Sequence, residues 1–467
     1  MTSLAPRDAT MYWLSTRTRN DLFLVYCFAD TGVPTARLRE TVTRRGLRIP
    51  DLRVRVRDAP ANLAYPGWVP CAFAEDQFRE HRLPTPTWSA ATTALAELLG
   101  TGLDASHRPW RLHVFRGIID APLAPAEPAI VAVLQVSHAL ADGRRAADIA
   151  RALFTDSGIT DESTGAAGFF AAAVNRVLPV TLADRLKTAV PLWNAALAVP
   201  TLPMGVSRTV IRGIAAYRAQ RELADLTAAG QLPPPGSGYA PNPLNGDGGA
   251  PRHAVRMMVR AAGKTRAPGY TVTIVVLTAV SLAVQRYLAA RNEPVEVLGA
   301  QVPVATFDRA AGQRNSYGDL SVDLAVAEPD PRLRADRIAT DMAARRERAR
   351  HPLHVAQDRV TAVIPAPILR WDVNGYPIDG LPERVSGHTV VSSVHRGPAD
   401  LTFGGGAVRF TAGFPALGSV MHLTHGVHGL GDTVTVSVHA DPAVIPDLDE
   451  YAELLDAALD EVVTALR

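Results

Sequence analysis

One short polar segment combines residue types that can do chemistry: Ser137-His138-Ala139-Leu140-Ala141-Asp142-Gly143. A histidine with a pKa of about 6.5 can take a proton from an alcohol or an amine at neutral pH. Asp142 can either hydrogen-bond the imidazole or pair with an arginine and so hold the loop, and Gly143 lets the backbone turn closely. The segment therefore predicts His138 as a general base. His-x-x-x-Asp-Gly alone is a weak pattern, because a lone histidine is more often structural.

The residues around this segment place it at the end of a central strand. Ala129 to Val136 (AIVAVLQV) is a continuous apolar run, typical of a strand that is buried on both faces. Arg144 to Phe154 follows with the pattern of a helix. The histidine is thus predicted in a strand-to-helix turn, where it can face a cleft.

The rest of the chain alternates in the same way, so the fold class is α/β. The crossover between two halves is expected to be helical, and the Pro- and Gly-rich stretch Gln231 to Gly249 is a loop or linker. We expect an N-terminal subdomain at 1–160, a helical crossover at 161–230 and a C-terminal subdomain at 231–467. Strands are predicted at 21–28, 111–116, 129–136, 253–259, 295–304, 320–326, 389–394, 407–411 and 432–439, and helices at 35–45, 88–99, 144–154, 272–284, 331–350 and after a cap at Asp447.

Composition excludes several classes of protein. The 467 residues carry 48 Lys and Arg against 46 Asp and Glu, which is too balanced for nucleic-acid binding. Cys27 and Cys71 cannot form a disulfide framework or a four-thiolate metal site, and the N-terminus does not resemble a signal peptide, so a cytoplasmic protein is expected. The apolar run Val272 to Val284 is too short for a bilayer and predicts a core helix. Ala189 to Val206 is apolar but interrupted by prolines, which favours a packed linker over contact with a lipid surface.

Three further patterns do not indicate a functional site. His422, His425 and His428 recur every third residue without a carboxylate or cysteine to complete a metal site. Gly404-Gly405-Gly406 lacks the Lys-Ser/Thr of a phosphate loop. The chain has no G-x-S-x-G elbow of a serine esterase.

Read with its strand, LQVSHALADGRRAADI resembles the HHxxxDG motif of CoA-dependent acyltransferases of the chloramphenicol acetyltransferase and condensation-domain superfamily. More narrowly, the chain resembles the bacterial wax ester synthase/diacylglycerol acyltransferase family from end to end. The segments that carry this resemblance are LAPRDATMYWL at 4–14, LDASHRPWRLHVFRG at 103–117, PLNG at 243–246, the apolar helix at 269–288 and the terminal helix at 441–459.

The resemblance implies two chloramphenicol-acetyltransferase-like subdomains, each a mixed sheet flanked by helices, with the active site in a tunnel between them. It makes His138 the general base, Asp142 the residue that supports the loop, usually by an ion pair, and Gly143 the glycine beside the acyl thioester. Asn315 matches the asparagine of a "GN" motif near the tunnel.

This chain departs from the family at three places. Ser137 replaces the first histidine, and Thr273-Ile274 replaces an Asn-Asp pair. Ser393 begins a segment that matches an "NVPGP" turn with one extra residue. Ser137, Asn315, Ser393 and Thr273 are the residues expected to bind substrate.

The implied reaction moves an acyl group from acyl-CoA, a co-substrate, to a hydroxyl acceptor such as a long-chain alcohol or diacylglycerol. No covalent acyl-enzyme and no cofactor are expected.

Two alternatives stay open. One is a tailoring acyltransferase that acylates a specialised metabolite from CoA or an acyl carrier protein, which the lost Asn-Asp pair favours. The other is a non-catalytic or lipid-binding relative, against which His138, Asp142 and Gly143 argue. Peripheral contact with a membrane or lipid body is a further option.

Overall fold

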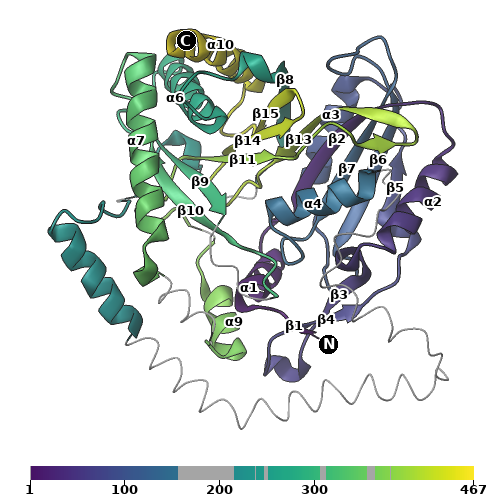
Figure 1. Ribbon diagram of the computed structural model, residues 1–467, viewed down its shortest axis with the longest axis horizontal. Coiled ribbons are helices and arrows are strands. Elements are labelled where there is room, and N and C mark those ends of the chain that lie inside the picture. The colour runs from purple at the N-terminus through teal and green to yellow at the C-terminus, as the bar shows by residue number, and fades with distance from the viewer. Residues whose placement is uncertain are drawn as a thin grey trace.

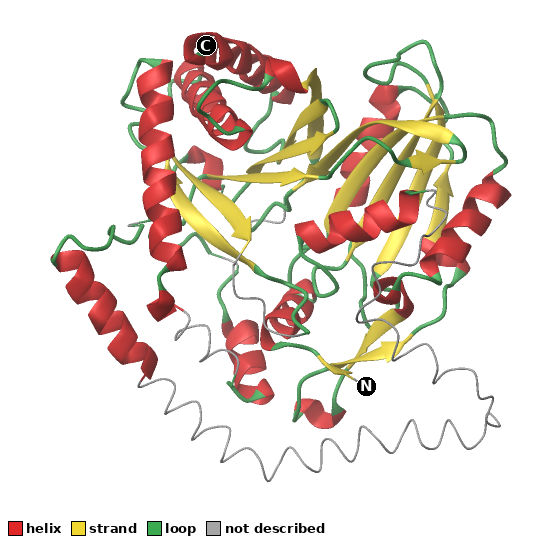
Figure 2. Cartoon of the chain, in the orientation of Figure 1, coloured by secondary structure: helices red, strands yellow, loops and turns green. Residues whose placement is uncertain are grey.

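Two sheets of six strands each, both flanked by helices, form the two halves of the molecule (Figures 1 and 2). The structure is a computed structural model that describes residues 2–155, 215–236, 238–246, 251–305, 312–354, 363–378 and 380–467. The predicted α/β class with two mixed halves is confirmed. Most of the crossover expected at 161–230 lies outside the described residues, and within it residues 215–228 form a helix.

The N-terminal half is built around β7, which pairs antiparallel with β2 on one side and β6 on the other. All eight residues of β7 are buried, as the apolar run predicted. The sheet order is β12-β13-β2-β7-β6-β5, and β1, β4 and β3 form a small separate sheet. The elements of this half are β1 (Thr2–Ser3), α1 (Pro6–Ser15), β2 (Leu22–Ala29), α2 (Thr35–Gly46), β3 (Val54–Arg57), β4 (Gly67–Pro70), β5 (Phe78–His81), α3 (Trp88–Leu99), β6 (Trp110–Ile118), β7 (Ala129–Val136) and α4 (Gly143–Phe154).

Strand β2 shows why this sheet needs helices on both faces. Leu24, Tyr26 and Phe28 pack in one core cluster with residues of α2 and α4. The alternate residues Phe23, Val25 and Cys27 pack in another cluster with α3. Successive side chains of a strand point to opposite faces, so an apolar strand is stable only where both faces are covered.

The C-terminal half has the strand order β10-β9-β11-β14-β15-β8, and β11 is parallel to both of its neighbours. Helices α6, α7 and α10 lie together beside this sheet (Figure 1). The elements of the C-terminal part of the chain are β8 (Ala254–Ala261), α6 (Val272–Ala290), β9 (Gly299–Ala305), β10 (Tyr317–Asp323), α7 (Pro331–Arg350), α9 (Ala366–Gly375), β11 (Thr389–His395), β12 (Thr402–Phe403), β13 (Gly406–Phe414), β14 (Leu423–Leu430), β15 (Thr433–Ala440) and α10 (Leu448–Leu466), of which α9, β12 and β13 pack with the N-terminal half.

Helix α6 is long and apolar enough to cross a membrane by length and composition alone. Here it is largely buried and shares a core cluster with α7, α10 and the C-terminal sheet. The sequence prediction of a core helix therefore describes its packing, although the helix extends beyond the predicted end at residue 284 to Ala290.

Strands β12 and β13 cross from the C-terminal part of the chain into the N-terminal sheet. They lie between β11 and β14 in sequence, yet β13 pairs antiparallel with β2 (Figure 1). A Cβ at Gly406 would lie 1.9 Å from the carbonyl oxygen of Ala29, so the close approach of the two strands requires glycine there. The subdomain predicted at 231–467 is therefore not self-contained, because two of its strands complete the other half.

Candidate active site

His138 occupies the turn between β7 and α4, as predicted. The turn is held by its own backbone: the Ser137 N–H donates to the Pro109 carbonyl, and the Leu140 N–H donates to the Ser137 carbonyl, both at 2.8 Å. Asp142 then caps α4, because its Oδ1 accepts the Arg145 N–H at 2.8 Å. An aspartate cap satisfies a backbone N–H that would otherwise lack a partner in the first turn.

The imidazole of His138 is held by a residue from the other half of the molecule. Its Nδ1 lies 2.8 Å from Oδ1 of Asn315. The amide nitrogen of Asn315 donates to the His138 carbonyl at 2.8 Å and to Asp8 Oδ1 at 3.0 Å. Asp8, fully buried in α1, also accepts the Asn315 N–H at 2.9 Å.

These contacts define the tautomer of His138. The carboxylate of Asp8 and the carbonyl of His138 accept hydrogen bonds, so they require the NH₂ end of the Asn315 amide. The amide oxygen must then face Nδ1, which carries the hydrogen, and Nε2 keeps its lone pair. Burial lowers the pKa of His138 below its usual 6.5, so the neutral base is the form present at neutral pH.

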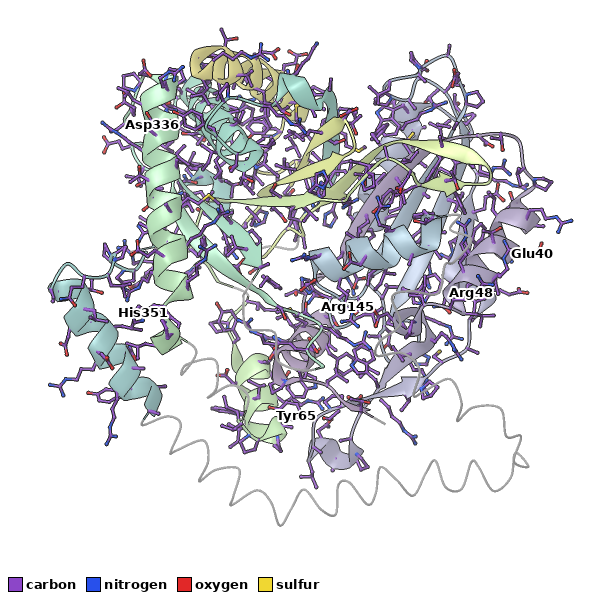
Figure 3. All side chains as sticks on the ribbon, viewed as in Figure 1. Glu40, Arg48, Tyr65, Arg145, Asp336 and His351 are labelled. Atoms are coloured by element: carbon purple, nitrogen blue, oxygen red, sulfur yellow. The ribbon has the colours of Figure 1, made fainter. Side chains whose placement is uncertain are left out.

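Asp142 joins the two halves through backbone groups. Its Oδ2 accepts the Ser316 N–H at 3.0 Å, and its own N–H donates to the Arg314 carbonyl at 3.3 Å. Neither alternative predicted for Asp142, a hydrogen bond to the imidazole or an ion pair with arginine, is present among the described residues. The arginine pairs near this loop belong to Asp51, which binds Arg145 at 2.8 Å and Arg314 at 2.5 Å. Arg145, in the first turn of α4, is labelled in Figure 3.

A cavity of about 720 Å³ lies in front of His138, with walls from both halves. Of the residues that the sequence singled out, His138, Asp142, Gly143 and Ser393 line it. The cavity, hereafter the histidine pocket, is lined by Asn20, Leu22, His138, Asp142, Gly143, Arg144, Gln301, Pro303, Val304, Ala305, Ser316, Tyr317, Asp319, Val390, Ser392, Ser393, Val394, His395, Pro415 and Ala416.

The other three predicted substrate contacts are not on this wall. Asn315 is buried, and its side chain contacts His138 rather than the pocket. Ser137 is fully buried, and its Oγ has no hydrogen-bond partner among the described residues. Thr273 is in the first turn of α6, and its neighbour Ile274 packs in the C-terminal core. The substitution of the Asn-Asp pair thus lies away from the described lining of the histidine pocket.

The structure adds polar groups that the sequence did not indicate. His395 Nδ1 accepts the Gly397 N–H at 3.2 Å, so a neutral His395 carries its hydrogen on Nε2 and can donate. The ring of Tyr317 lies 5.6 Å from the ring of His138, and burial raises the pKa of Tyr317 to about 12, which keeps it a phenol. His395 lies within the segment that begins at Ser393, and Tyr317 lies two residues after Asn315, but only the fold shows that both line the histidine pocket.

The N-terminus of α4 also faces the histidine pocket. Gly143 and Arg144 line it, and their backbone N–H groups donate to no described residue. Free N–H groups and the helix dipole favour negative charge at such a position. Within the described part of the chain, no group of three or more His, Cys, Asp or Glu side chains is arranged to hold a metal ion.

A neutral histidine in a strand-to-helix turn, two mixed sheets and a cavity between them are features of the CoA-dependent acyltransferase and condensation-domain class. The chain matches the model of the wax ester synthase/diacylglycerol acyltransferase catalytic domain over residues 4–237 and that of the WS/DGAT C-terminal domain over residues 314–462. The chain therefore belongs to the wax ester synthase/diacylglycerol acyltransferase family, and it is an acyltransferase.

Solved structures share this fold at low sequence identity. The wax ester synthase/diacylglycerol acyltransferase from Marinobacter aquaeolei VT8 is 19% identical, with 99% of this chain and 100% of that chain covered and a TM-score of 0.62. A mutant starter condensation domain of rhizomide synthetase RzmA, solved in complex with C8-CoA and Leu-SNAC, is 14% identical, with 100% and 95% covered and a TM-score of 0.55. At these identities the likeness concerns the fold.

Proposed function

We propose that this protein transfers an acyl group from acyl-CoA to the hydroxyl of a long-chain alcohol or diacylglycerol, with His138 as general base. The observation that carries the proposal is the hydrogen bond from His138 Nδ1–H to Asn315 Oδ1 at 2.8 Å. It leaves the Nε2 lone pair of a residue that lines the histidine pocket without a described partner. Membership of the acyltransferase family supports this reading, as does the C8-CoA bound by the rhizomide synthetase domain.

The reaction proceeds by direct transfer. His138 Nε2 removes the hydroxyl proton as the acceptor oxygen attacks the thioester carbonyl carbon. The tetrahedral intermediate then breaks its carbon–sulfur bond, and the departing thiolate takes the proton from the imidazolium. The products are the ester and free CoA, and no acyl group is bound to the protein at any step.

Donors for the oxyanion come from the pocket wall. The backbone N–H groups of Gly143 and Arg144, the Ser393 hydroxyl and the His395 Nε2–H are available there. Asn315 is excluded, because both hydrogens of its amide are already donated to Asp8 and to the His138 carbonyl. One well-placed donor is typically worth about 3 to 4 kcal/mol of barrier.

A tailoring acyltransferase is the second candidate, and one observation favours it. Side chains of Gln301, Ser392 and Asp319 from three neighbouring strands line the histidine pocket beside its apolar residues. A pocket with polar groups favours an acceptor that satisfies them and disfavours one that leaves them unpaired. Thr273 and Ile274 do not line the histidine pocket, so their replacement of the Asn-Asp pair does not favour a tailoring acceptor.

The test measures CoA release from a long-chain acyl-CoA with hexadecanol, diacylglycerol, a polyhydroxylated acceptor or no acceptor, and identifies the ester by mass spectrometry. We expect His138→Ala to lower kcat by about 10²- to 10⁴-fold without loss of fold. The matched control is His107→Ala, a surface histidine whose side chain is 80% exposed. Activity of His138→Ala within threefold of wild type would overturn the assignment, and ester formation only with polyhydroxylated acceptors would replace the lipid acceptor with the tailoring one.

A further inference from the structure

A second cavity, of about 740 Å³, is lined by segments from both the N-terminal and the C-terminal parts of the chain. Its walls come from the turn after α1, the C-terminal part of α3, the residues before β8 and the segment between β13 and β14. None of these residues belongs to the motif around His138. We call this cavity the arginine pocket.

The two pockets share two stretches of chain. Asn20 and Leu22 line the histidine pocket, while residues 15–19 line the arginine pocket. In the same way, Pro415 and Ala416 line the first, and residues 417–419 line the second. Consecutive residues of both stretches therefore line different pockets, which places the two pockets next to each other along the chain.

The charge of the arginine pocket is positive. Arg17, Arg19 and Arg252 line it, against the single carboxylate of Glu97. No ion pair within 4 Å joins any of the three arginines to a carboxylate in the part of the chain that the structure describes, although the charge of Arg19 acts on the buried carboxylate of Asp21. Arg17 uses one nitrogen to donate to the Val373 carbonyl at 2.6 Å. A guanidinium has five N–H donors in a planar fork that matches phosphate, so most donors in this pocket are left for a ligand.

A histidine of defined tautomer completes the wall. His439 Nδ1 donates to the Pro415 carbonyl at 2.9 Å, so its Nε2 accepts the hydrogen of His253 Nδ1, also at 2.9 Å. His253 then carries a bare Nε2 and lines the arginine pocket. Burial lowers the pKa of both histidines, that of His439 to about 3, so the pair is neutral. His253 Nε2 can accept an amide N–H or a hydroxyl of a ligand.

We propose that the arginine pocket binds the phosphate end of the acyl donor through Arg17, Arg19 and Arg252 while the thioester end reaches His138. This proposal rests on the proposed function, because it assumes a thioester donor. The chemistry it recognises is a phosphate ester attached to a pantetheine arm, whose amides supply hydrogens for His253 Nε2. That arm has two sources, CoA and an acyl carrier protein.

The test compares donors with and without phosphate. Arg19→Gln with Arg252→Gln removes two charges, and a charged hydrogen bond is worth about 1.5 to 3 kcal/mol, or roughly tenfold or more. We expect kcat/KM for acyl-CoA to fall at least tenfold, mainly through KM, while the acyl-N-acetylcysteamine thioester, which has no phosphate, changes less than twofold. The matched control is Arg37→Gln, which removes a surface arginine of α2 that is 73% exposed.

Acyl-phosphopantetheine separates the two sources. A loss equal to that with acyl-CoA would place the phosphate shared by CoA and carrier proteins in the arginine pocket. A loss confined to acyl-CoA would place the nucleotide phosphates there, and both results support the proposal. Equal losses with acyl-CoA and the phosphate-free thioester, or no loss with either, would overturn it.

Calorimetric titration of CoA itself keeps this test independent of catalysis. In a His138→Ala background, the double arginine change should weaken CoA binding at least tenfold. If no thioester is turned over but the double arginine change still weakens CoA binding at least tenfold, the proposed function fails and the phosphate site stands. If CoA binds the arginine variant as tightly as the background protein, the phosphate site fails whatever the activity.

Discussion

Replacing Asn315 with alanine tests the central geometry of the site. The change removes three hydrogen bonds, with His138 Nδ1 at 2.8 Å, the His138 carbonyl at 2.8 Å and Asp8 at 3.0 Å. Because Asn315 is only 1% exposed, its partners stay largely without water, and we expect a loss of about 2 to 4 kcal/mol of unfolding free energy. Without the Asn315 oxygen at Nδ1, the tautomer with hydrogen on Nε2, which cannot act as a base, also becomes more competitive.

The hydrogen bond to Nδ1 is worth about 1 to 1.5 kcal/mol, or roughly tenfold in the tautomer ratio, and loss of ring orientation adds to it. We therefore expect kcat to fall about 10- to 100-fold in a CoA-release assay, at a temperature where circular dichroism shows the variant folded. The control is Asn245→Ala, because Asn245 is equally buried and its amide links the Val420 carbonyl at 2.8 Å and the Asn242 N–H at 3.0 Å. That variant should lose comparable stability and no more than the activity expected from its unfolded fraction. If Asn315→Ala keeps kcat within twofold of wild type, Asn315 does not orient the base.

Four further outcomes follow from the same contacts. The pH profile of kcat/KM should lose activity only below about pH 6.5, because burial lowers the pKa of His138 and the neutral form is active; a midpoint above pH 7 would contradict this. Asp142→Asn should cost about 1 to 3 kcal/mol in urea denaturation, since an NH₂ group would face the Ser316 N–H; full stability with a selective loss of rate would show a direct role in catalysis. Gly143→Ala should raise stability by about 0.5 to 1 kcal/mol and keep activity within threefold, because the new Cβ meets only Val394 Cγ2 at 3.8 Å; a tenfold loss of kcat/KM would show that the thioester needs this space. Thr273→Asn should leave the ratio of kcat/KM for hexadecanol to kcat/KM for polar acceptors within twofold of the wild-type ratio. A larger change would show that the first turn of α6 contacts the acceptor.

Local sequence was sufficient for the elements that carry the motif. The apolar run 129–136 could only be a strand covered on both faces, and the Asp-Gly pair after it could cap and begin a helix, so His138 was expected in the turn where it lies. The terminal helix was equally determined, since Asp447 caps it and its apolar residues follow helical spacing. In these cases the residues that decide the structure are neighbours in sequence.

Other features depend on residues that are far apart in the chain. No residue near Gly406 indicates that β13 pairs with β2 rather than with a strand close to it in sequence. The edge of β2 with which it pairs lies nearly four hundred residues earlier in the chain. Strand β14 was likewise not predicted from the sequence, and the structure places it between β11 and β15 in the C-terminal sheet.

The sequence by itself determined that His138 lies in the turn after a buried strand of an α/β acyltransferase. Only the tertiary structure decided which tautomer His138 adopts. Asp8 and Asn315 are separated by 307 positions, and the hydrogen bonds between them set the tautomer of His138. Spacing along the chain could not reveal this, because hydrogen bonds depend on distances of about 3 Å that arise only when the two halves of the molecule pack together.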